Sequence, residues 1–492
     1  MSGAIFSPAD AVDTQALLRT AFDRLACNLL LLRIDTPATA RTWLLERLPE
    51  LASVARIGHD KPPVRHTLQL ALSAEGLRQL GHEGLLEQFA PEFTTAPGDD
   101  VNRLRRLGDI GANSPEHWRW GVGERAPHLL LMLFCAPGEL DERSAGLLAS
   151  AAAAGLSLVE SLPAADLDGF EPFGFRDGIS QPELDWQGTR KPGGAEDMDY
   201  QRRIALGEFL LGYRNEYDLY TDRPLLAASI PRAQELPLAE EQPNHHDLGR
   251  NGTYLVLRQL QQDVSGFWRW VRQQSEGDDS ALELAEAMVG RHLDGSPFAR
   301  LNARDGNNDF TFADDRSGHA CPFGAHIRRA NPRTGDYAQG RSGTLGKLLA
   351  LLGFSGNAEE DHIASARFHR LLRRGREYGG APYVAIDGET GAPAETGLYF
   401  ICLNANLARQ FEFVQGAWIA SATFAGLNRE QDPLLGNRLP FPGEQPTDGF
   451  SQPSTEGACR FTCALPRFVT LRGGGYFFLP GLKALAWLLH EP

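Results

Sequence analysis

The sequence has few cysteines, no long hydrophobic run and no excess of positive charge. Its 492 residues include 6 cysteines, and 48 lysines and arginines stand against 63 aspartates and glutamates, which gives a net charge of -15. An acidic chain repels nucleic acid and anionic membrane surfaces, so we expect neither as a partner. The longest apolar runs, such as residues 126–135, are shorter than the roughly 18–20 residues that cross a bilayer. We therefore expect no membrane span.

Signals for export and for zinc binding are also lacking. The first residues show no basic cluster followed by an apolar stretch and a cleavage site, so the sequence predicts a cytoplasmic protein. Only Cys459 and Cys463 are close together, and no histidine lies beside them, which is not the spacing of a zinc site. We expect all six cysteines to be buried, reduced thiols.

The length and composition indicate a folded protein with more than one domain. Hydrophobic residues make up 42% of the chain and charged residues 23%, which is close to the average of globular proteins. A chain of 492 residues exceeds what one hydrophobic core usually serves. We predict an N-terminal domain over residues 1–165 and a C-terminal domain over residues 166–492, in which residues 166–193 form an irregular, Gly- and Pro-rich linker.

Hydrophobic patterns predict alternating strands and helices in both halves. In the first half we expect strands at 28–34, 66–72 and 129–134 and helices at 38–51, 74–80 and 144–156. This order suits a ferredoxin-like α+β sandwich, although periodicity alone does not separate it from a parallel α/β unit. In the second half we expect strands at 252–260 and 397–403, helices at 265–274 and 408–417, a hairpin at 468–479, and elaborations at 276–320 and 330–365.

The segment Gly-Phe-Arg-Asp-Gly at residues 174–178 is the first candidate for chemistry. Its two glycines allow unusual backbone angles around Asp177, so the loop can present this carboxylate to a pocket. Asp-Gly is also the commonest turn dipeptide, and the motif by itself favours a structural turn.

A second segment, residues 324–333, places His326 ahead of several arginines and an Asn-Pro-Arg sequence. A neutral imidazole can ligate iron, although a lone histidine is more often a hydrogen-bonded structural residue.

A third segment, residues 367–380, contains two leucines followed by Arg373 and Arg374. An arginine directed into an apolar pocket requires a charge there, and the alternative is a basic helix at the surface. Leu398 and Phe400 lie two residues apart on an expected strand, hence on the same face, where they serve either a pocket or an ordinary core.

Together, and in this order, the three segments resemble those of the dye-decolourising haem peroxidases, most closely the larger bacterial subgroup. The resemblance extends over nearly the whole chain through residues 91–93, 107–111, 207–217, 410–415 and 469–478. It implies two ferredoxin-like domains with antiparallel sheets flanked by helices, in a dimeric α+β barrel-type arrangement. It also implies a non-covalent haem b in the C-terminal domain, since the chain has no Cys-x-x-Cys-His sequence for thioether bonds.

The resemblance also implies roles for individual residues. Asp177 matches the distal acid-base residue, His326 the iron ligand, and Arg373, in preference to Arg374, the distal arginine. Asp432, in preference to Glu412, would orient the histidine. The haem pocket would be completed by Phe175 and Gly178 of the loop and by Leu398 and Phe400, which narrow the space for peroxide. Arg328, Arg329 and Arg333 could compensate the two haem carboxylates.

The implied activity is the reduction of hydrogen peroxide through a ferryl intermediate with oxidation of a small aromatic or dye-like reductant. The alternative is a non-catalytic protein that binds haem or handles its iron, which would not require both Asp177 and Arg373. The sequence indicates neither the physiological reductant nor the oligomeric state.

Overall fold

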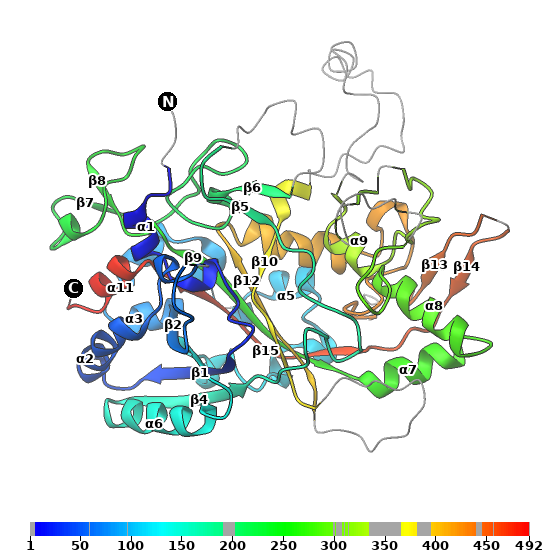
Figure 1. The fold of residues 1–492 in the computed structure, drawn as a ribbon, viewed down its shortest axis with the longest axis horizontal. Helices are drawn as coiled ribbons and strands as arrows, with labels where there is room; N and C mark the ends of the chain where they lie inside the picture. The colour runs from blue at the N-terminus through cyan, green and yellow to red at the C-terminus, as the bar shows by residue number, and fades with distance from the viewer. Residues whose placement is uncertain are drawn as a thin grey trace, which may run out of the picture.

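The fold is built on one large antiparallel sheet, with helices packed against it (Figure 1). The computed structural model describes residues 5–58, 60–95, 97–189, 202–298, 301, 308, 310–312, 314–333, 366–380, 395–438, 445–455 and 457–491. Nine strands form the sheet, in the order β10-β12-β9-β15-β2-β3-β1-β4, with β11 paired to β12. Figure 1 shows α2, α3, α6 and α11 at one end of the molecule and α7, α8 and α9 at the other.

The first half of the chain contributes four strands in the spatial order β4-β1-β3-β2. Between them lie the helices of a β-α-β-β-α-β unit, which is the ferredoxin-like arrangement. The elements are β1 Ala26–Ile34, α2 Pro37–Arg47, β2 His66–Leu72, α3 Ala74–Gln79, β3 Leu129–Cys135, α6 Leu140–Ala153 and β4 Leu156–Pro163.

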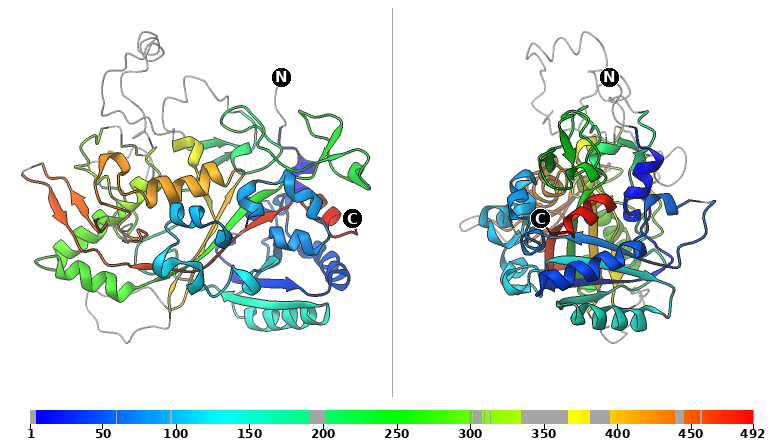
Figure 2. Two further views of the ribbon diagram at one scale, coloured as in Figure 1. Left: turned by 180° about the vertical axis from the view of Figure 1, so that it is seen from behind. Right: turned by 90° about the vertical axis from the view of Figure 1, so that its left-hand side faces the viewer.

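The second half repeats this order with β9 as its first strand and β15 as its last. The elements are β9 Thr253–Gln262, α7 Val264–Gln273, α8 Asp278–Val289, β10 Leu372–Arg373, β11 Arg376–Tyr378, β12 Gly397–Asn404, two π-helical segments Ala408–Glu412 and Val414–Ile419, and β15 Val469–Leu479. The pair Phe478 and Leu72 joins β15 to β2, so the two halves share one sheet. β15 crosses the molecule toward the C-terminal helix (Figure 2).

Shorter elements surround the sheet. The helices are α1 Pro8–Asp13, α4 Pro91–Thr94, α5 Val101–Leu107, α9 His326–Ala330 and α11 Leu482–Leu488. The short strand pairs are β5 Glu183–Asp185 with β6 Arg203–Ala205, β7 Leu225–Ala227 with β8 His245–Asp247, and β13 Phe450–Gln452 with β14 Arg460–Thr462. No helix among the described residues is long and apolar enough to cross a membrane.

The two faces of the sheet carry different hydrophobic clusters. One cluster takes residues from all nine strands, including Leu162 of β4 and Tyr378 of β11. The backbone N–H of Ala165, just after β4, donates to the carbonyl of Glu377 on β11 at 2.8 Å, so the two ends of the sheet approach each other. The other cluster packs the opposite face against helices α2, α3 and α11. These features confirm the predicted α+β class with two ferredoxin-like units.

Several predicted elements differ from the structure. Residues 469–479 form one continuous strand and not a hairpin, because the glycines there make room for the indole of Trp120 and do not turn the chain. Strand β4 was not predicted, since its polar, half-exposed residues hide the alternation. Part of the expected elaboration at 276–320 is helix α8, and most of 330–365 lies outside the described residues. The domain boundary at residue 165 stays a prediction.

The cysteines divide into two groups. Cys27, Cys135, Cys321 and Cys402 are buried, as expected, but Cys459 and Cys463 are exposed. The expectation that all six are buried is wrong for this pair, because both flank β14, a strand of a small two-stranded sheet apart from the main sheet.

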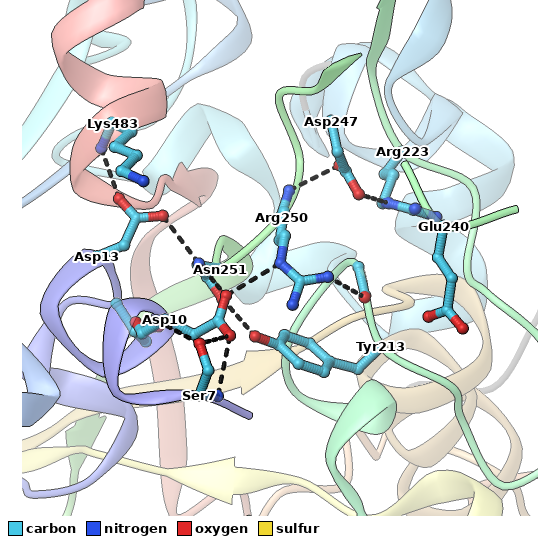
Figure 3. Close-up of polar contacts among 12 residues, drawn as sticks. Ser7, Asp10, Asp13, Tyr213, Arg223, Glu240, Asp247, Arg250, Asn251 and Lys483 are labelled. Atoms are coloured by element: carbon cyan, nitrogen blue, oxygen red, sulfur yellow. Dashed lines mark hydrogen bonds and ion pairs between the residues drawn. The ribbon is translucent and has the colours of Figure 1, made fainter. Parts of the chain in front are cut away.

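A buried polar network joins the two ends of the described chain (Figure 3). The backbone N–H of Lys483 donates to Asp13 at 2.7 Å, and the Asn251 amide donates to the same carboxylate at 2.8 Å. Arg250 donates to Asp10 at 3.0 Å, and Asn251 accepts a hydrogen bond of 2.7 Å from the Tyr213 hydroxyl. Helices α1 and α11 are thereby held to the segment that precedes β9.

We expect Gly473→Ala to lower the free energy of unfolding by about 1–3 kcal/mol, the usual cost of overpacking a core. A Cβ at this position would lie 2.5 Å from the indole of Trp120, which is fully buried. Gly474→Ala is the matched control, because its Cβ would meet neighbours at 3.6 Å, an ordinary contact. Urea denaturation of both variants checks this, and equal stabilities would contradict it.

Candidate active site

A cavity of about 290 Å³ lies among β9, β12, α9 and the loop that follows β4. Six of the eight predicted site residues line it. They are Phe175, Asp177, His326, Arg373, Leu398 and Phe400. The other two, Gly178 and Asp432, contact lining residues and do not line the cavity themselves.

The loop that carries Asp177 is closed by its own backbone. The N–H of Asp177 donates to the carbonyl of Gly169 at 3.0 Å, and Phe170 pairs with Arg176 as an isolated bridge. Gly178 adopts a φ of 76°, in the left-handed region that favours glycine, and its N–H donates to the Asp177 carboxylate. The segment is therefore a turn, and its conformation directs the Asp177 carboxylate toward the cavity.

Arg373 is the partner of Asp177. It lies on β10, and its guanidinium donates to the Asp177 carboxylate at 2.9 Å. Its backbone N–H donates to the side chain of Gln181 at 3.1 Å, which ties the strand to the end of the same loop. Burial alone would raise the pKa of Asp177, but the charge of Arg373 acts together with the hydrogen bonds to the carboxylate and with His326, and their sum lowers this pKa below its usual value. Asp177 is thus an ionised carboxylate beside a fixed cation.

Arg374 points elsewhere. Its guanidinium donates to the carbonyls of Leu17 and Leu18 at 2.6 and 2.7 Å, and burial lowers its pKa to about 10. Adjacent residues of a strand face opposite sides, so only one of the two arginines can reach the cavity. The structure places Arg373 there.

His326 begins the short helix α9, and Asp432 orients its ring. Nδ1 of His326 lies 2.9 Å from an oxygen of Asp432, whose other oxygen accepts the N–H groups of Leu434 and Leu435 at 2.9 and 2.8 Å. Burial would lower the pKa of His326, but the Asp432 carboxylate raises it above its usual value. With Nδ1 donating to Asp432, Nε2 carries the lone pair that can bind a metal.

Glu412, the other carboxylate weighed for this position, lies in a different network. Its carboxylate accepts hydrogen bonds from Arg106 at 2.7 Å and from the Tyr476 hydroxyl at 3.1 Å.

Only one of the three arginines of the His326 segment lines the cavity, namely Arg333. Arg329 is fully buried and donates to the carbonyls of Trp418 and Ser421, while Arg328 donates to Asp315. The expectation that all three face an anionic ligand is wrong, because two of them fix α9 to the surrounding chain.

The sequence reasoning missed other charged groups that line the cavity. Glu171 accepts hydrogen bonds from Gln262 at 2.7 Å and from Phe175 N–H at 2.9 Å, and burial raises its pKa to about 7. Arg258 of β9 forms a buried ion pair with Asp109. An arginine within an otherwise apolar strand was the available signal, but its partner lies 149 residues away.

His326 is a single imidazole donor, without a metal cluster around it. Among the described residues no group of three or more His, Cys, Asp or Glu side chains is placed to hold a metal ion.

Known proteins similar in sequence are peroxidases, although no model of a known protein family matches the chain. The multifunctional dye peroxidase DyP2 of Amycolatopsis sp. is 31% identical over 335 residues, which are 65% of this chain and 61% of that protein. The dye-decolorizing peroxidase AauDyP1 of Auricularia auricula-judae is 25% identical over 486 residues, 92% of this chain and 81% of that protein. The match to DyP2 thus spans less than two thirds of its length.

Solved structures share the fold over almost the full chain. The Auricularia peroxidase in complex with imidazole superimposes with a TM-score of 0.70 at 23% identity, covering 98% of this chain and 99% of that one. A dye-decolorizing peroxidase in complex with 2,6-dimethoxyphenol superimposes with the same TM-score, 0.70, at 22% identity and the same coverage. At this identity the likeness shows the fold.

We expect Asp432→Asn to lower the pKa of His326 below its ordinary value of 6.5, because burial then acts without the opposing carboxylate. The protein free of bound ligand is titrated, and the ring protons of His326 are followed by NMR. Glu412→Gln is the control and leaves the pKa of His326 raised. A raised pKa that persists in Asp432→Asn would contradict this account.

Proposed function

We propose that the chain is a member of the dye-decolourising peroxidase family, a haem peroxidase that reduces hydrogen peroxide and oxidises small aromatic reductants, dyes included; its sequence relatives and the shared fold support this. One observation carries the proposal. The pair Asp177–Arg373 and the pair His326–Asp432 belong to one cavity, and His326 is close enough to Asp177 and Arg373 for their charges to affect its pKa.

The cavity has donors that suit a non-covalent haem b. His326 offers Nε2 to the iron, and Asp432 holds the ring in the tautomer that this requires. Arg333 lines the cavity, and its guanidinium, which donates to the carbonyl and the side chain of Asn308 at 2.9 and 2.7 Å, brings a positive charge there that suits a haem carboxylate. Apolar side chains, including Phe175, Leu398 and Phe400, supply much of the remaining lining. When bound, haem supplies the iron that binds peroxide and the electrons that cleave its O–O bond.

In this proposal Asp177 is the acid-base residue, and Arg373 stabilises negative charge. The Asp177 carboxylate would take the proton from one oxygen of peroxide and return it to the other, which would leave as water. Arg373 stabilises the negative charge that develops as the O–O bond breaks, and it already carries its charge in the resting site. Each peroxide consumed then takes two electrons from two molecules of reductant.

Leu398 and Phe400 restrict what reaches this pair. They lie two residues apart on β12 and both line the cavity. We expect peroxide to pass and bulky dyes to give up electrons from the surface. The neighbour solved with 2,6-dimethoxyphenol supports a phenolic reductant for this chain. A cytoplasmic location and membership of the larger bacterial subgroup stay predictions.

A protein that only stores or transfers haem needs the histidine but not an ionised carboxylate beside an arginine. The Asp177–Arg373 contact of 2.9 Å therefore favours the enzyme.

We expect Asp177→Ala to slow the reaction with peroxide by about 10²–10⁴-fold, the usual contribution of a general base. Arg373→Ala slows it by about 10²–10³-fold through loss of charge stabilisation. The absorbance of the haem-loaded protein is followed by stopped flow after one equivalent of peroxide. Arg374→Ala is the control and reacts at the wild-type rate. Wild-type rates in Asp177→Ala and Arg373→Ala would mean that haem is cargo.

The pH profile follows from the lowered pKa of Asp177. The base works only when ionised, so the rate is lost as pH falls through this pKa, below the ordinary carboxyl value of 3.8. Activity should therefore persist under mildly acidic conditions. Arg373→Ala raises the pKa of Asp177 and moves the acid limb to higher pH. Rates of the peroxide reaction across the pH range test this, and a wild-type rate that is already lost as pH falls through neutrality would rule out Asp177 as the base.

A further inference from the structure

A second histidine–carboxylate pair belongs to the cavity. His292 lines the cavity, in the turn that follows α8, and its Nδ1 lies 2.6 Å from an oxygen of Glu286. The other oxygen of Glu286 accepts the N–H of Leu293 at 3.1 Å, and the ring of Phe298 meets the imidazole edge-on at 5.0 Å. These contacts orient the ring and leave Nε2 as the nitrogen that can accept a proton.

The turn that carries His292 is fixed to the loop of Asp177. The N–H of Arg176 donates to the carbonyl of Leu293 at 3.0 Å. Within the turn, the N–H of His292 donates to the carbonyl of Ser296 at 3.1 Å. His292 is therefore held by the same framework that positions the peroxide site, although it makes no contact with Asp177 among the described residues.

Exposure distinguishes this pair from His326–Asp432. The side chain of His292 is 43% exposed and that of Glu286 11%, against 28% and 0% for His326 and Asp432. His292 lines the cavity and still reaches solvent, which places it where a reductant would enter and where a proton could leave.

We propose that His292 is the base that receives the hydroxyl proton of a phenolic reductant, and that Glu286 is its positioning residue. This inference rests on the proposed function. A phenol offers one O–H donor on an apolar ring, and next to His292 the cavity is lined by Val289 and Ile179, which suit such a ring. A neutral imidazole held by a carboxylate is suited to accept that hydrogen.

The step balances for one electron. The O–H bond of the phenol breaks, its proton goes to Nε2 of His292, and one electron goes to the peroxide-oxidised haem, which leaves a neutral phenoxyl radical. The proton passes from His292 to solvent at its exposed edge. Two phenols are consumed for each peroxide. Without the base, loss of one electron would convert the phenol into a radical cation that still holds its hydroxyl proton, and this species is harder to form than the neutral radical.

Two reductants test the proposal. Phenol must lose a proton, whereas ferrocyanide gives up an electron alone. In haem-loaded protein with excess peroxide, we expect His292→Gln to lower kcat/KM for phenol about 100-fold and to change that for ferrocyanide less than twofold. Glu286→Gln should show the same selectivity with a loss of about 10-fold, because the base remains but is less well oriented. His117→Gln is the matched control, since His117 is exposed beside Glu116 at 3.6 Å and does not line the cavity.

The binding of phenol to the protein tests the same contact without any reaction. Equilibrium dialysis without peroxide compares phenol with anisole, which has the same ring and no hydroxyl hydrogen. We expect the wild type to bind phenol more tightly, and the difference to vanish in His292→Gln. Haem content of every variant reports whether the cavity is intact, and Glu286→Gln supplies the same comparison if His292→Gln loses its fold.

Three outcomes would overturn the inference. Unchanged phenol oxidation in His292→Gln would exclude His292 as the base. A proportional loss for both reductants together with loss of haem would assign His292 to cofactor binding. Equal binding of phenol and anisole in the wild type would show that the phenol hydroxyl forms no hydrogen bond with His292. Failure of the proposed function is separate, since the wild type would then oxidise neither phenol nor ferrocyanide.

Discussion

The pairing of β9 with β12 on one side and β15 on the other is the constraint from which the site follows. Its register sets Leu398 opposite Leu260 and Phe400 opposite Arg258. β12 in turn pairs with β10, where Arg373 lies opposite Cys402. Backbone hydrogen bonds thus fix an arginine and two apolar side chains relative to one another without depending on flexible side-chain contacts. A shift of one residue would turn all three away from the cavity.

Charge pairing then gives the carboxylates of the site different properties. Asp177 beside Arg373 and Asp432 beside His326 both have lowered pKa values, because in each the charged partner and the hydrogen bonds to the carboxylate together outweigh the effect of burial. Among the described residues, Glu171 accepts hydrogen bonds from neutral donors only. Burial therefore dominates and raises the pKa of Glu171 to about 7. The same chemical group is therefore a permanent anion at two positions and a group that titrates near neutrality at the third.

Two imidazole–carboxylate pairs border one cavity and differ in access to solvent. In both, Nδ1 contacts one oxygen of a carboxylate, and the other oxygen of that carboxylate accepts a hydrogen bond from the backbone nearby. The side chain of His326 is 28% exposed and that of His292 is 43% exposed, while their carboxylate partners are 0% and 11% exposed. The less exposed pair suits lasting ligation of a metal, because its fully buried carboxylate holds the ring in one orientation. The more exposed pair suits proton exchange, because the base must release its proton after each turnover.

The sequence by itself determined several strands, among them β1, β2 and β12, because a short segment rich in apolar residues is a local pattern that marks a buried strand. It also predicted which two segments carry Asp177 and His326, because glycine and proline mark such segments. Only the tertiary structure decided that residues 469–479 run straight, since the reason is the indole of Trp120, far away in the chain. The same holds for Asp432 over Glu412 and for the pairing of His292 with the cavity. Such choices depend on contacts between distant segments, and these have no local signature.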